Sequence, residues 1–571
     1  MTQLQQRFIH VIFLFIAFCA CMGFFALLIF RSYAQLLQIP QPSLLRGREM
    51  TLLIGSCIVW LVAMLVAYLL RPRRLQHTYG SAHFANVQEL RAADLVLPSR
   101  ETPGKGQPSA LELGTIGRHR IGLTERKQQS HVLLVAPTGK GKTTGVIIPG
   151  LLREYGHRSL FINDIKGELI DKTASALSTF MPVNVFQPTR PEQSLCYNPL
   201  AFVHSMEDAE DLATVFVENS GKSTEQFWNA AAKLLLTATI LHIRDTEPEA
   251  PLCRISDLLT SSDLESVKAL LLESPSSLAK SIATTFVHSI SLNERLAGSI
   301  MTDMSVRLLM LKNPDIRTVT ARNELNFDVS ESSALFLSIP MSASERLKWL
   351  SSCLIMQMMK SYVRQAERTP DLALPRGVAF YLDEFANIGV IPHYTEYISL
   401  VRSLGISLIM AIQNFGQLIE TYGEHGKNTI LANATTQVVF PGCGLAEAQH
   451  YSDFVGVTTA TTTTRSGNAR RLLAMDTSES RSETQRRLLT ADEIRTMKLG
   501  HLLVLCDNLY PFQVRNRTYF ERPELRKRVT AYQVPRRTLS EPVPYTPPPP
   551  ENEAKNGTIE TIKPDEGMMK E

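Results

Sequence analysis

The sequence has few cysteines for its length, and none of them is spaced as a metal site requires. Eight cysteines are scattered over 571 residues without a C-x-x-C pair or other metal-ligand spacing, which argues against a zinc motif and disfavours a disulfide framework. Such a scatter suits reduced, packed thiols in a cytoplasmic protein. Net charge is also small: 59 Lys+Arg face 55 Asp+Glu, and +4 does not identify a nucleic-acid partner. The hydrophobic content of 44% excludes a mainly disordered chain.

Long apolar runs, in contrast, are present near the N-terminus. Residues 8–30 and 51–70 contain no Asp, Glu, Lys or Arg, and each can cross a hydrocarbon core of about 30 Å as a helix. The first run is too long for the apolar part of a signal peptide, and no A-x-A cleavage site follows it. The mean hydropathy of the whole chain, −0.03, is high for a soluble protein, and these two apolar runs explain the high value. We therefore predict a two-helix transmembrane anchor over residues 1–74.

The orientation of this anchor is only weakly indicated by its arginines, which lie at both ends and in the intervening loop. The nucleotide site described next decides the orientation, because ATP is cytoplasmic and the domain that binds it must be cytoplasmic too. We expect a two-pass protein whose N-terminus and main domain are both in the cytoplasm.

A phosphate-binding loop follows a short apolar run at residues 131–135. The loop consists of Ala136, Pro137, Thr138, Gly139, Lys140, Gly141, Lys142, Thr143 and Thr144. Its glycines would let backbone N–H groups wrap the phosphates of ATP. Lys142 would reach the β- and γ-phosphates, and the Thr143 hydroxyl would bind Mg²⁺. The P-loop pattern begins with glycine, where this chain has Ala136, and the expected flanking strand and helix favour a true site.

A second apolar run, residues 378–382, ends in Asp383 and Glu384. Alone, an acidic pair in this position is often only the end of a strand. Combined with the P-loop, it predicts that Asp383 holds Mg²⁺ through water and that Glu384 orients or deprotonates the attacking water.

Polar residues end two further expected strands. Residues 159–163 run into Asp164-Ile-Lys166-Gly167-Glu168, and residues 407–412 end at Gln413. Ligands of open α/β sheets lie at the carboxyl ends of the strands, so Gln413 could sense the γ-phosphate. The alternative is a capping or solvent-facing amide. Arg402 could act as an arginine finger on a neighbouring subunit's ATP, and an ordinary surface arginine is an equally good interpretation.

The motifs, taken together, resemble those of the type IV secretion and conjugation coupling proteins, which are hexameric membrane ATPases related to DNA translocases. In chain order they are Tyr79-Gly-Ser-Ala82, the P-loop, Asp164–Leu169, Asn198-Pro-Leu200, Phe227-Trp228, Asp383-Glu384, Gln413 and Leu488–Ile494. The resemblance covers nearly the whole chain. It departs at Ala136, where a small residue in a turn costs little. It implies a bacterial inner-membrane protein with a RecA-like P-loop α/β nucleotide-binding domain and an inserted all-α domain.

The domain boundaries follow from the same resemblance and from the local patterns. We expect the nucleotide-binding domain over residues 75–204 and 326–537, and the all-α domain over residues 205–325. Residues 206–323 show helical patterns with almost no strand alternation, and the strand-like run 334–339 marks the return to the sheet. The family places the all-α domain where substrates are received.

Two segments have more than one interpretation. Residues 456–487 are rich in Thr, Ser and Arg and predict a hairpin followed by an exposed loop, although Arg465, Arg470 and Arg471 could instead face DNA in a central channel. Residues 538–571 predict a disordered, proline-rich tail. Seven acids against three lysines give the tail a net charge of −4, which leaves +8 on the first 537 residues. This tail is either a solubilising appendage or a docking segment for a substrate or adaptor.

The resemblance implies an ATPase that uses ATP and Mg²⁺ to deliver substrates to a type IV secretion channel in the inner membrane. Those substrates would be a relaxase–DNA complex, effector proteins or both, with DNA contacted without sequence specificity. Two other functions are considered. A chromosome-type DNA translocase usually has more membrane spans, a long linker and a winged-helix end. A docking receptor that binds ATP with little turnover is disfavoured by the intact Asp383-Glu384 pair.

Overall fold

The computed structural model describes residues 79–99, 103–220, 226–290, 294–466 and 478–538. These described residues belong to one compact unit, which begins at Tyr79. The predicted membrane spans lie outside the described residues, as does nearly all of the predicted tail. Within the described ranges, no helix is both long enough and apolar enough to cross a bilayer.

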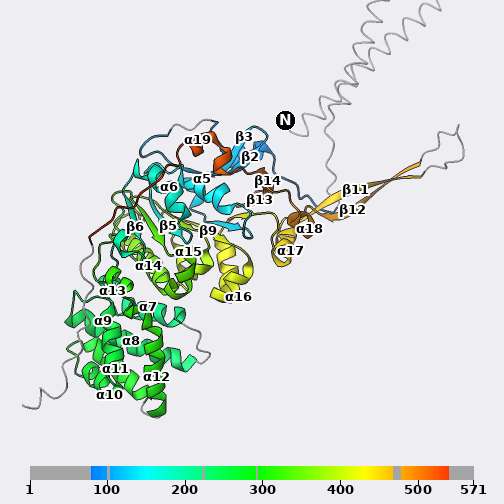
Figure 1. Ribbon diagram of the computed structural model, residues 1–571. Helices are drawn as coiled ribbons and strands as arrows, with labels where there is room; N and C mark the ends of the chain where they lie inside the picture. Colours follow the sequence, from blue (N-terminus) through cyan, green and yellow to red (C-terminus); the bar gives the residue numbers. More distant parts are fainter. Residues whose placement is uncertain (1–78, 100–102, 221–225, 291–293, 467–477, 539–571) are drawn as a thin grey trace, which may run out of the picture. The chain divides into compact units, whose positions relative to one another are not determined.

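A twelve-stranded mixed sheet runs through the described part of this unit (Figure 1). Its order is β1-β3-β2-β14-β13-β10-β4-β9-β8-β5-β7-β6. The strands from β10 to β6 pair in parallel, with bounds Thr436–Val439 (β10), Val132–Val135 (β4), Ile406–Ile412 (β9), Val378–Leu382 (β8), Ser159–Asp164 (β5), Ala334–Ser338 (β7) and Val183–Phe186 (β6). The antiparallel part consists of Val96–Leu97 (β1), His119–Thr124 (β3), Ala110–Ile116 (β2), Phe512–Arg515 (β14) and His501–Cys506 (β13).

The central strands are buried on both faces, which explains their continuous apolar sequences. Every residue of β4, β8 and β9 is buried, as parallel strands covered by helices on both sides require. The alternating side chains of β4 enter two separate cores, Leu133 and Val135 in one and Val132 and Leu134 in the other. The α/β class predicted from these runs is confirmed.

Helices contribute to the core on each face of the sheet. The core of Val132 and Leu134 includes η1 (Thr143–Ile147), α5 (Ile148–Leu151) and α6 (Glu168–Ser178). The opposite core includes α14 (Met341–Glu367), α15 (Tyr394–Leu400) and α16 (Phe415–Asn433). The remaining short helices are α3 (Val87–Ala92), α4 (Glu125–Gln128), η2 (Pro191–Gln193), η5 (Phe385–Ile388), α17 (Leu445–Phe454), α18 (Ala491–Arg495), η6 (Tyr519–Glu521) and α19 (Pro523–Arg526).

The described residues between β6 and β7 form helices and no strand (Figure 1, green). They are η2, η3 (Pro199–Phe202), α7 (Met206–Asn219), α8 (Gln226–Thr246), α9 (Cys253–Ser261), α10 (Leu264–Leu272), α11 (Ser277–Ile290), α12 (Glu294–Arg307), η4 (Leu309–Lys312) and α13 (Pro314–Val319). A capping box begins α7, because Ser205 Oγ accepts from the backbone N–H of Asp208 and the Asp208 carboxylate accepts from that of Ser205. The predicted boundaries of an all-α domain at 205 and 325 stay predictions.

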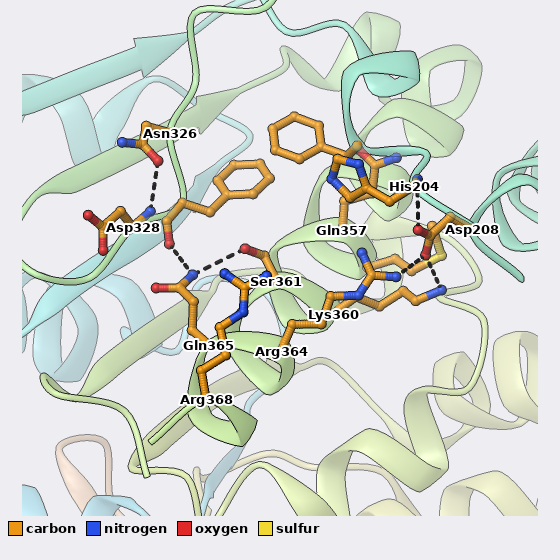
Figure 2. Close-up of a pocket in the computed structure, with 13 residues that line it drawn as sticks. His204, Asp208, Asn326, Asp328, Gln357, Lys360, Ser361, Arg364, Gln365 and Arg368 are labelled. Carbon is orange, nitrogen blue, oxygen red and sulfur yellow. Dashed lines mark hydrogen bonds and ion pairs between the residues drawn. The ribbon is translucent and has the colours of Figure 1, made fainter. Parts of the chain in front are cut away.

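A buried ion cluster joins this helical segment to α14 (Figure 2). The carboxylate of Asp208 lies 2.7 Å from Lys360 Nζ and 2.5 Å from an Arg364 nitrogen, and Asp211 lies 2.5 Å from the same Lys360 Nζ. Burial opposes ionisation of Asp208, but the hydrogen bonds from Lys360 and Arg364 outweigh it and lower its pKa to about 2. The cluster therefore stays ionised and holds α7 against α14 at neutral pH.

A buried histidine, His131, immediately precedes β4. The Nε2 atom of His131 lies 2.8 Å from the carbonyl oxygen of Ile398, and its Nδ1 accepts from the backbone N–H of Leu408 at 3.3 Å. These partners require a neutral ring with the proton on Nε2. Burial lowers the pKa of His131 to about 4, and the positive charge of Arg402 adds to this effect, while the bond to Ile398 opposes it.

We predict that His131 makes the fold labile to mild acid. The unfolded chain binds a proton on this ring near pH 6.5, whereas the folded chain does so only near pH 4. The free energy of unfolding therefore falls as the pH falls through this window, by about 3 kcal/mol in total. In thermal melts of the solubilised protein, the change in Tm between pH 7 and pH 5 should be smaller for His131→Asn than for wild type. The exposed His425→Asn variant is the control, and an equal change in Tm for all three proteins would contradict the assignment.

A two-stranded ribbon separate from the main sheet is formed by β11 (Val457–Ser466) and β12 (Ser478–Arg487), in antiparallel register (Figure 1, orange). This confirms the predicted hairpin. Its base bonds to the start of the described chain, where Ser81 forms a β-bridge with Thr458 and the N–H of Ala82 donates to Val457 O at 3.1 Å. The hairpin loop, with Arg470 and Arg471, lies outside the described residues, so their predicted contact with DNA stays a prediction.

Candidate nucleotide-binding site

The P-loop connects β4 to the helix that begins at Thr143, as the sequence predicted. The backbone N–H of Ala136 donates to Ile412 O at 3.0 Å, which ties the loop to the end of β9. Ala136 is fully buried and does not have a positive φ, so its methyl group packs into the core without backbone strain. The departure from glycine at this position is therefore accommodated.

The two glycines of the loop are required by backbone conformation. Gly139 and Gly141 have φ values of 76° and 87°. A Cβ at Gly139 would meet nothing within 4 Å, so crowding does not explain the residue. The positive φ of both residues explains the glycines, because glycine adopts a positive φ at little cost.

The lysine of the loop lies within a buried cluster of charge. Lys142 is 6% exposed, and its Nζ lies 2.5 Å from Glu384 Oε1 and 3.7 Å from Asp383 Oδ1. The Thr143 hydroxyl donates to Asp383 Oδ2 at 2.9 Å. Residues about 240 positions apart thus meet at the carboxyl ends of β4 and β8, as the sequence predicted for them.

The acidic pair at the end of β8 has two distinct environments. Burial raises the pKa of Asp383, with the charge of Lys142 and the Thr143 hydrogen bond opposing that rise. Its buried Oδ1 has no hydrogen-bond partner. Glu384 has a φ of 57°, in the left-handed region that side chains other than glycine rarely adopt. Such strain is characteristic of functional positions and here directs the carboxylate towards Lys142.

Gln413 joins the same cluster from the end of β9. Its Nε2 donates to Glu384 Oε2 at 3.0 Å, and its backbone N–H donates to Gln417 Oε1 at 2.8 Å. The Glu384 carboxylate is therefore held on one oxygen by Lys142 and on the other by Gln413. This position is compatible with sensing the γ-phosphate, which stays a prediction.

Arg402 lies at the other end of β9. It is exposed in the turn that precedes the strand, whereas Gln413 follows the strand's last residue. Within one chain, Arg402 therefore does not join the P-loop, Asp383 and Glu384. Its predicted action on a neighbouring subunit's nucleotide stays a prediction.

Two asparagines hold the backbone at and after the acidic pair, and no role was predicted for either of them. Asn163, at the end of β5, donates from Nδ2 to Asp383 O at 3.0 Å. Asn219, at the end of α7, accepts from Val390 N at 2.7 Å and donates to Val390 O at 2.9 Å. Asn163 thus fixes the backbone of Asp383, and Asn219 fixes the chain just after η5. The position of Asn163 near the end of an expected strand could have indicated a role at the site. No local sequence pattern indicates a role for Asn219.

The oxygen atoms around Thr143 fit a magnesium ion. Mg²⁺ prefers one or two protein oxygen ligands together with water and phosphate oxygens. At the mouth of the phosphate-binding loop, the Thr143 hydroxyl supplies one such oxygen, and Asp383 Oδ1, which accepts no hydrogen bond from the described residues, is placed to hold the ion through water. Asp164, at the end of β5, is buried with its pKa raised to about 6 by that burial, and the nearby charge of Asp383 adds to the rise.

Comparison with known proteins agrees with this geometry. The family described as type IV secretory system conjugative DNA transfer matches residues 83–541. The chain belongs to this family. It is 28% identical over 472 residues to the conjugal transfer protein TraG of Escherichia coli, covering 74% of this chain and 71% of TraG. It is 24% identical over 477 residues to the protein VirD4 of Rhizobium radiobacter, covering 82% of this chain and 67% of VirD4. The coupling-protein family predicted from the motifs is confirmed.

Solved structures show the same fold. The plasmid coupling protein TrwB in complex with ADP and Mg²⁺ matches with a TM-score of 0.56 at 14% identity, over 81% of this chain and 96% of that one. TrwB with the ATP analogue ADPNP matches with the same TM-score and identity, over 82% and 99%. Because the identity is low, this likeness establishes the α/β, RecA-like P-loop fold of the conjugative DNA transfer family and nothing finer.

Proposed function

We propose that this chain is the ATP-hydrolysing coupling protein of a type IV secretion system. The observation that carries the proposal is the meeting of Lys142, Thr143, Asp383, Glu384 and Gln413 at one edge of the sheet, in a chain of the conjugative DNA transfer family. The protein recruits a relaxase–DNA complex, effector proteins or both, and delivers them to the secretion channel. ATP and Mg²⁺ are its ligands.

Different residues of the chain bind the phosphates, hold the metal ion and activate the water. Backbone N–H groups of residues 136–144 cradle the phosphates, and the ammonium of Lys142 binds the β- and γ-phosphate oxygens. Thr143 and Asp383 would hold Mg²⁺, whose positive charge offsets the negative charge of the phosphates. Glu384, fixed by Lys142 and Gln413, orients the attacking water and accepts its proton.

The remaining parts of the proposal rest on the sequence. The apolar runs at residues 8–30 and 51–70 form a two-pass anchor in the bacterial inner membrane, with the N-terminus and the main domain cytoplasmic. The protein is a hexamer in which the exposed Arg402 reaches the nucleotide of a neighbouring subunit. It contacts DNA without sequence specificity.

A hydrolysis assay on the detergent-solubilised full chain tests this proposal. We expect phosphate release that requires Mg²⁺, stops when EDTA removes the ion, and increases when single-stranded DNA is added. In cells, deletion of the gene should stop transfer of the secretion substrate, and the wild-type gene should restore it. Nucleotide binding without turnover, with or without DNA, would refute the enzyme and favour a docking receptor. Hydrolysis with normal substrate transfer in the deletion strain would refute the coupling role.

A further inference from the structure

A large polar cavity lies at the carboxyl ends of β5, β7 and β6. It encloses about 840 Å³. One wall is the turn after β5, a second is the turn after β6, and a third is the segment of residues 532–536 near the end of the described chain. Parallel strands thus bring both turns to one sheet edge, the same edge that carries the nucleotide site.

Three cations line this cavity, one from each wall. Lys166, Arg190 and Arg536 are all exposed, and among the described residues none of their side chains has a hydrogen-bond or ion-pair partner. Asp171 is the one acid among the described lining residues. We call this cavity, defined by its three cations, the basic groove. Its uncompensated positive charge favours an anionic ligand.

The cavity in Figure 2 shows the contrasting case of compensated cations. It encloses about 460 Å³ and is also lined by basic residues, including Lys360 and Arg364. Lys360 and Arg364 are both paired with Asp208, so their charges hold α7 against α14, whereas Arg368 lines the same cavity without such a partner among the described residues. Both cavities contain lysine and arginine. The basic groove differs because none of its three cations is paired with an acid among the described residues.

Lys166 connects the basic groove to the nucleotide site. It follows β5, and the neighbouring strand β8 ends next to Asp383. Burial raises the pKa of Asp383, and the charge of Lys166 is one of the positive charges that oppose this rise. An anion bound at Lys166 would therefore alter the electric field at the carboxylate assigned to Mg²⁺.

The other lining residues suit a nucleic-acid strand better than a lone anion. Gln187, Thr189, Gln193 and Ser338 offer amide and hydroxyl groups, which contact phosphates and sugars without reading sequence. Tyr532 is half-buried and supplies an aromatic ring to the same cavity. A ring beside cations is the combination that binds unstacked bases and their backbone.

We propose that the basic groove binds single-stranded DNA, with Lys166, Arg190 and Arg536 contacting its phosphodiester backbone. The proposal rests on the proposed function in one respect, namely that the chain handles DNA. A DNA segment held here would lie at the same sheet edge as the nucleotide site.

Binding of a labelled oligothymidine to the solubilised full chain, measured by fluorescence anisotropy at several salt concentrations, tests this site. Each phosphate contact on a single strand contributes about −0.7 to the slope of log K against log salt. The Arg190→Ala/Arg536→Ala variant should therefore make this negative slope shallower by about 1.4, and the triple variant that also carries Lys166→Ala should make it shallower by about 2.1 in total. The matched control Arg91→Ala/Arg126→Ala/Arg368→Ala removes as much charge from exposed positions and should keep the wild-type slope.

Several results would overturn the proposal. They are an unchanged slope in the groove variants, an equal loss in the control, and an equal loss on duplex DNA, which would exclude a preference for single strands. Full competition by inorganic phosphate would show a free-phosphate site instead. Hydrolysis without DNA should be unchanged in the Arg190→Ala/Arg536→Ala variant. Failure of the groove is thus distinguishable from failure of the proposed function, in which wild type itself does not hydrolyse ATP.

Discussion

Replacing Lys142 with alanine is expected to abolish ATP hydrolysis by the solubilised protein and substrate transfer by cells. Lys142 is the cation of the buried cluster, 2.5 Å from Glu384 and 3.7 Å from Asp383. The variant removes the charge that would stabilise the transferring phosphoryl group, and removal of one such electrostatic contact typically costs about 10²–10³-fold in rate. It also leaves two buried carboxylates facing the incoming phosphates without a cation. Phosphate release and transfer frequency should both fall to background.

The control for this experiment is Lys268→Ala. Lys268 lies on α10, where it pairs with the exposed Glu265, and its loss should change stability by less than about 0.5 kcal/mol. Membrane insertion and the Tm of Lys142→Ala must be measured alongside, so that loss of activity is not confused with loss of folding. Normal transfer by a folded, inserted Lys142→Ala protein would remove ATP from the mechanism.

Replacing Glu384 with glutamine is expected to separate nucleotide binding from turnover. Glutamine keeps the shape of the side chain and an oxygen for Lys142, but it cannot accept a proton from water. Loss of a general base lowers kcat by about 10²–10⁴-fold. The Kd for a fluorescent ATP analogue should stay within a few fold of wild type, because Lys142 and the phosphate-binding loop are unchanged.

The paired control is Glu345→Gln, which makes the same substitution at an exposed residue on α14 and should leave kcat unchanged. A kcat within a few fold of wild type for Glu384→Gln would show that another group activates the water. In that case Asp164, which is buried at the neighbouring strand end, is the next carboxylate to test.

The sequence was sufficient for the parts of the site that depend on local pattern. Continuous apolar runs predicted the strands that became β4, β5, β8 and β9, because a strand buried on both faces has no polar alternation. The glycines and Lys142 mark the phosphate-binding loop because phosphate contact depends on a short continuous stretch of backbone. The acidic pair was recognisable because ligands gather at strand ends.

Contacts between distant segments could not be predicted from the sequence. Asn219 and Val390 are 171 positions apart, and no property of either residue indicates that they meet. The basic groove likewise depends on strand order, which places the turns after β5 and β6 beside residues 532–536. The structure also shows why alanine is tolerated at position 136 in place of glycine. Ala136 does not need a positive φ, and its methyl group is buried in the core.

The base of the hairpin has a mechanical consequence. Tyr79 N donates to Thr459 Oγ1 at 3.0 Å, that hydroxyl donates to Gly80 O at 3.3 Å, and Ala82 N donates to Val457 O at 3.1 Å. Tension applied to the chain at Tyr79 is therefore resisted first by these bonds to β11, and only afterwards by the main sheet. The pairing at the base of the hairpin therefore takes up such a load before it reaches the strands that carry the nucleotide site.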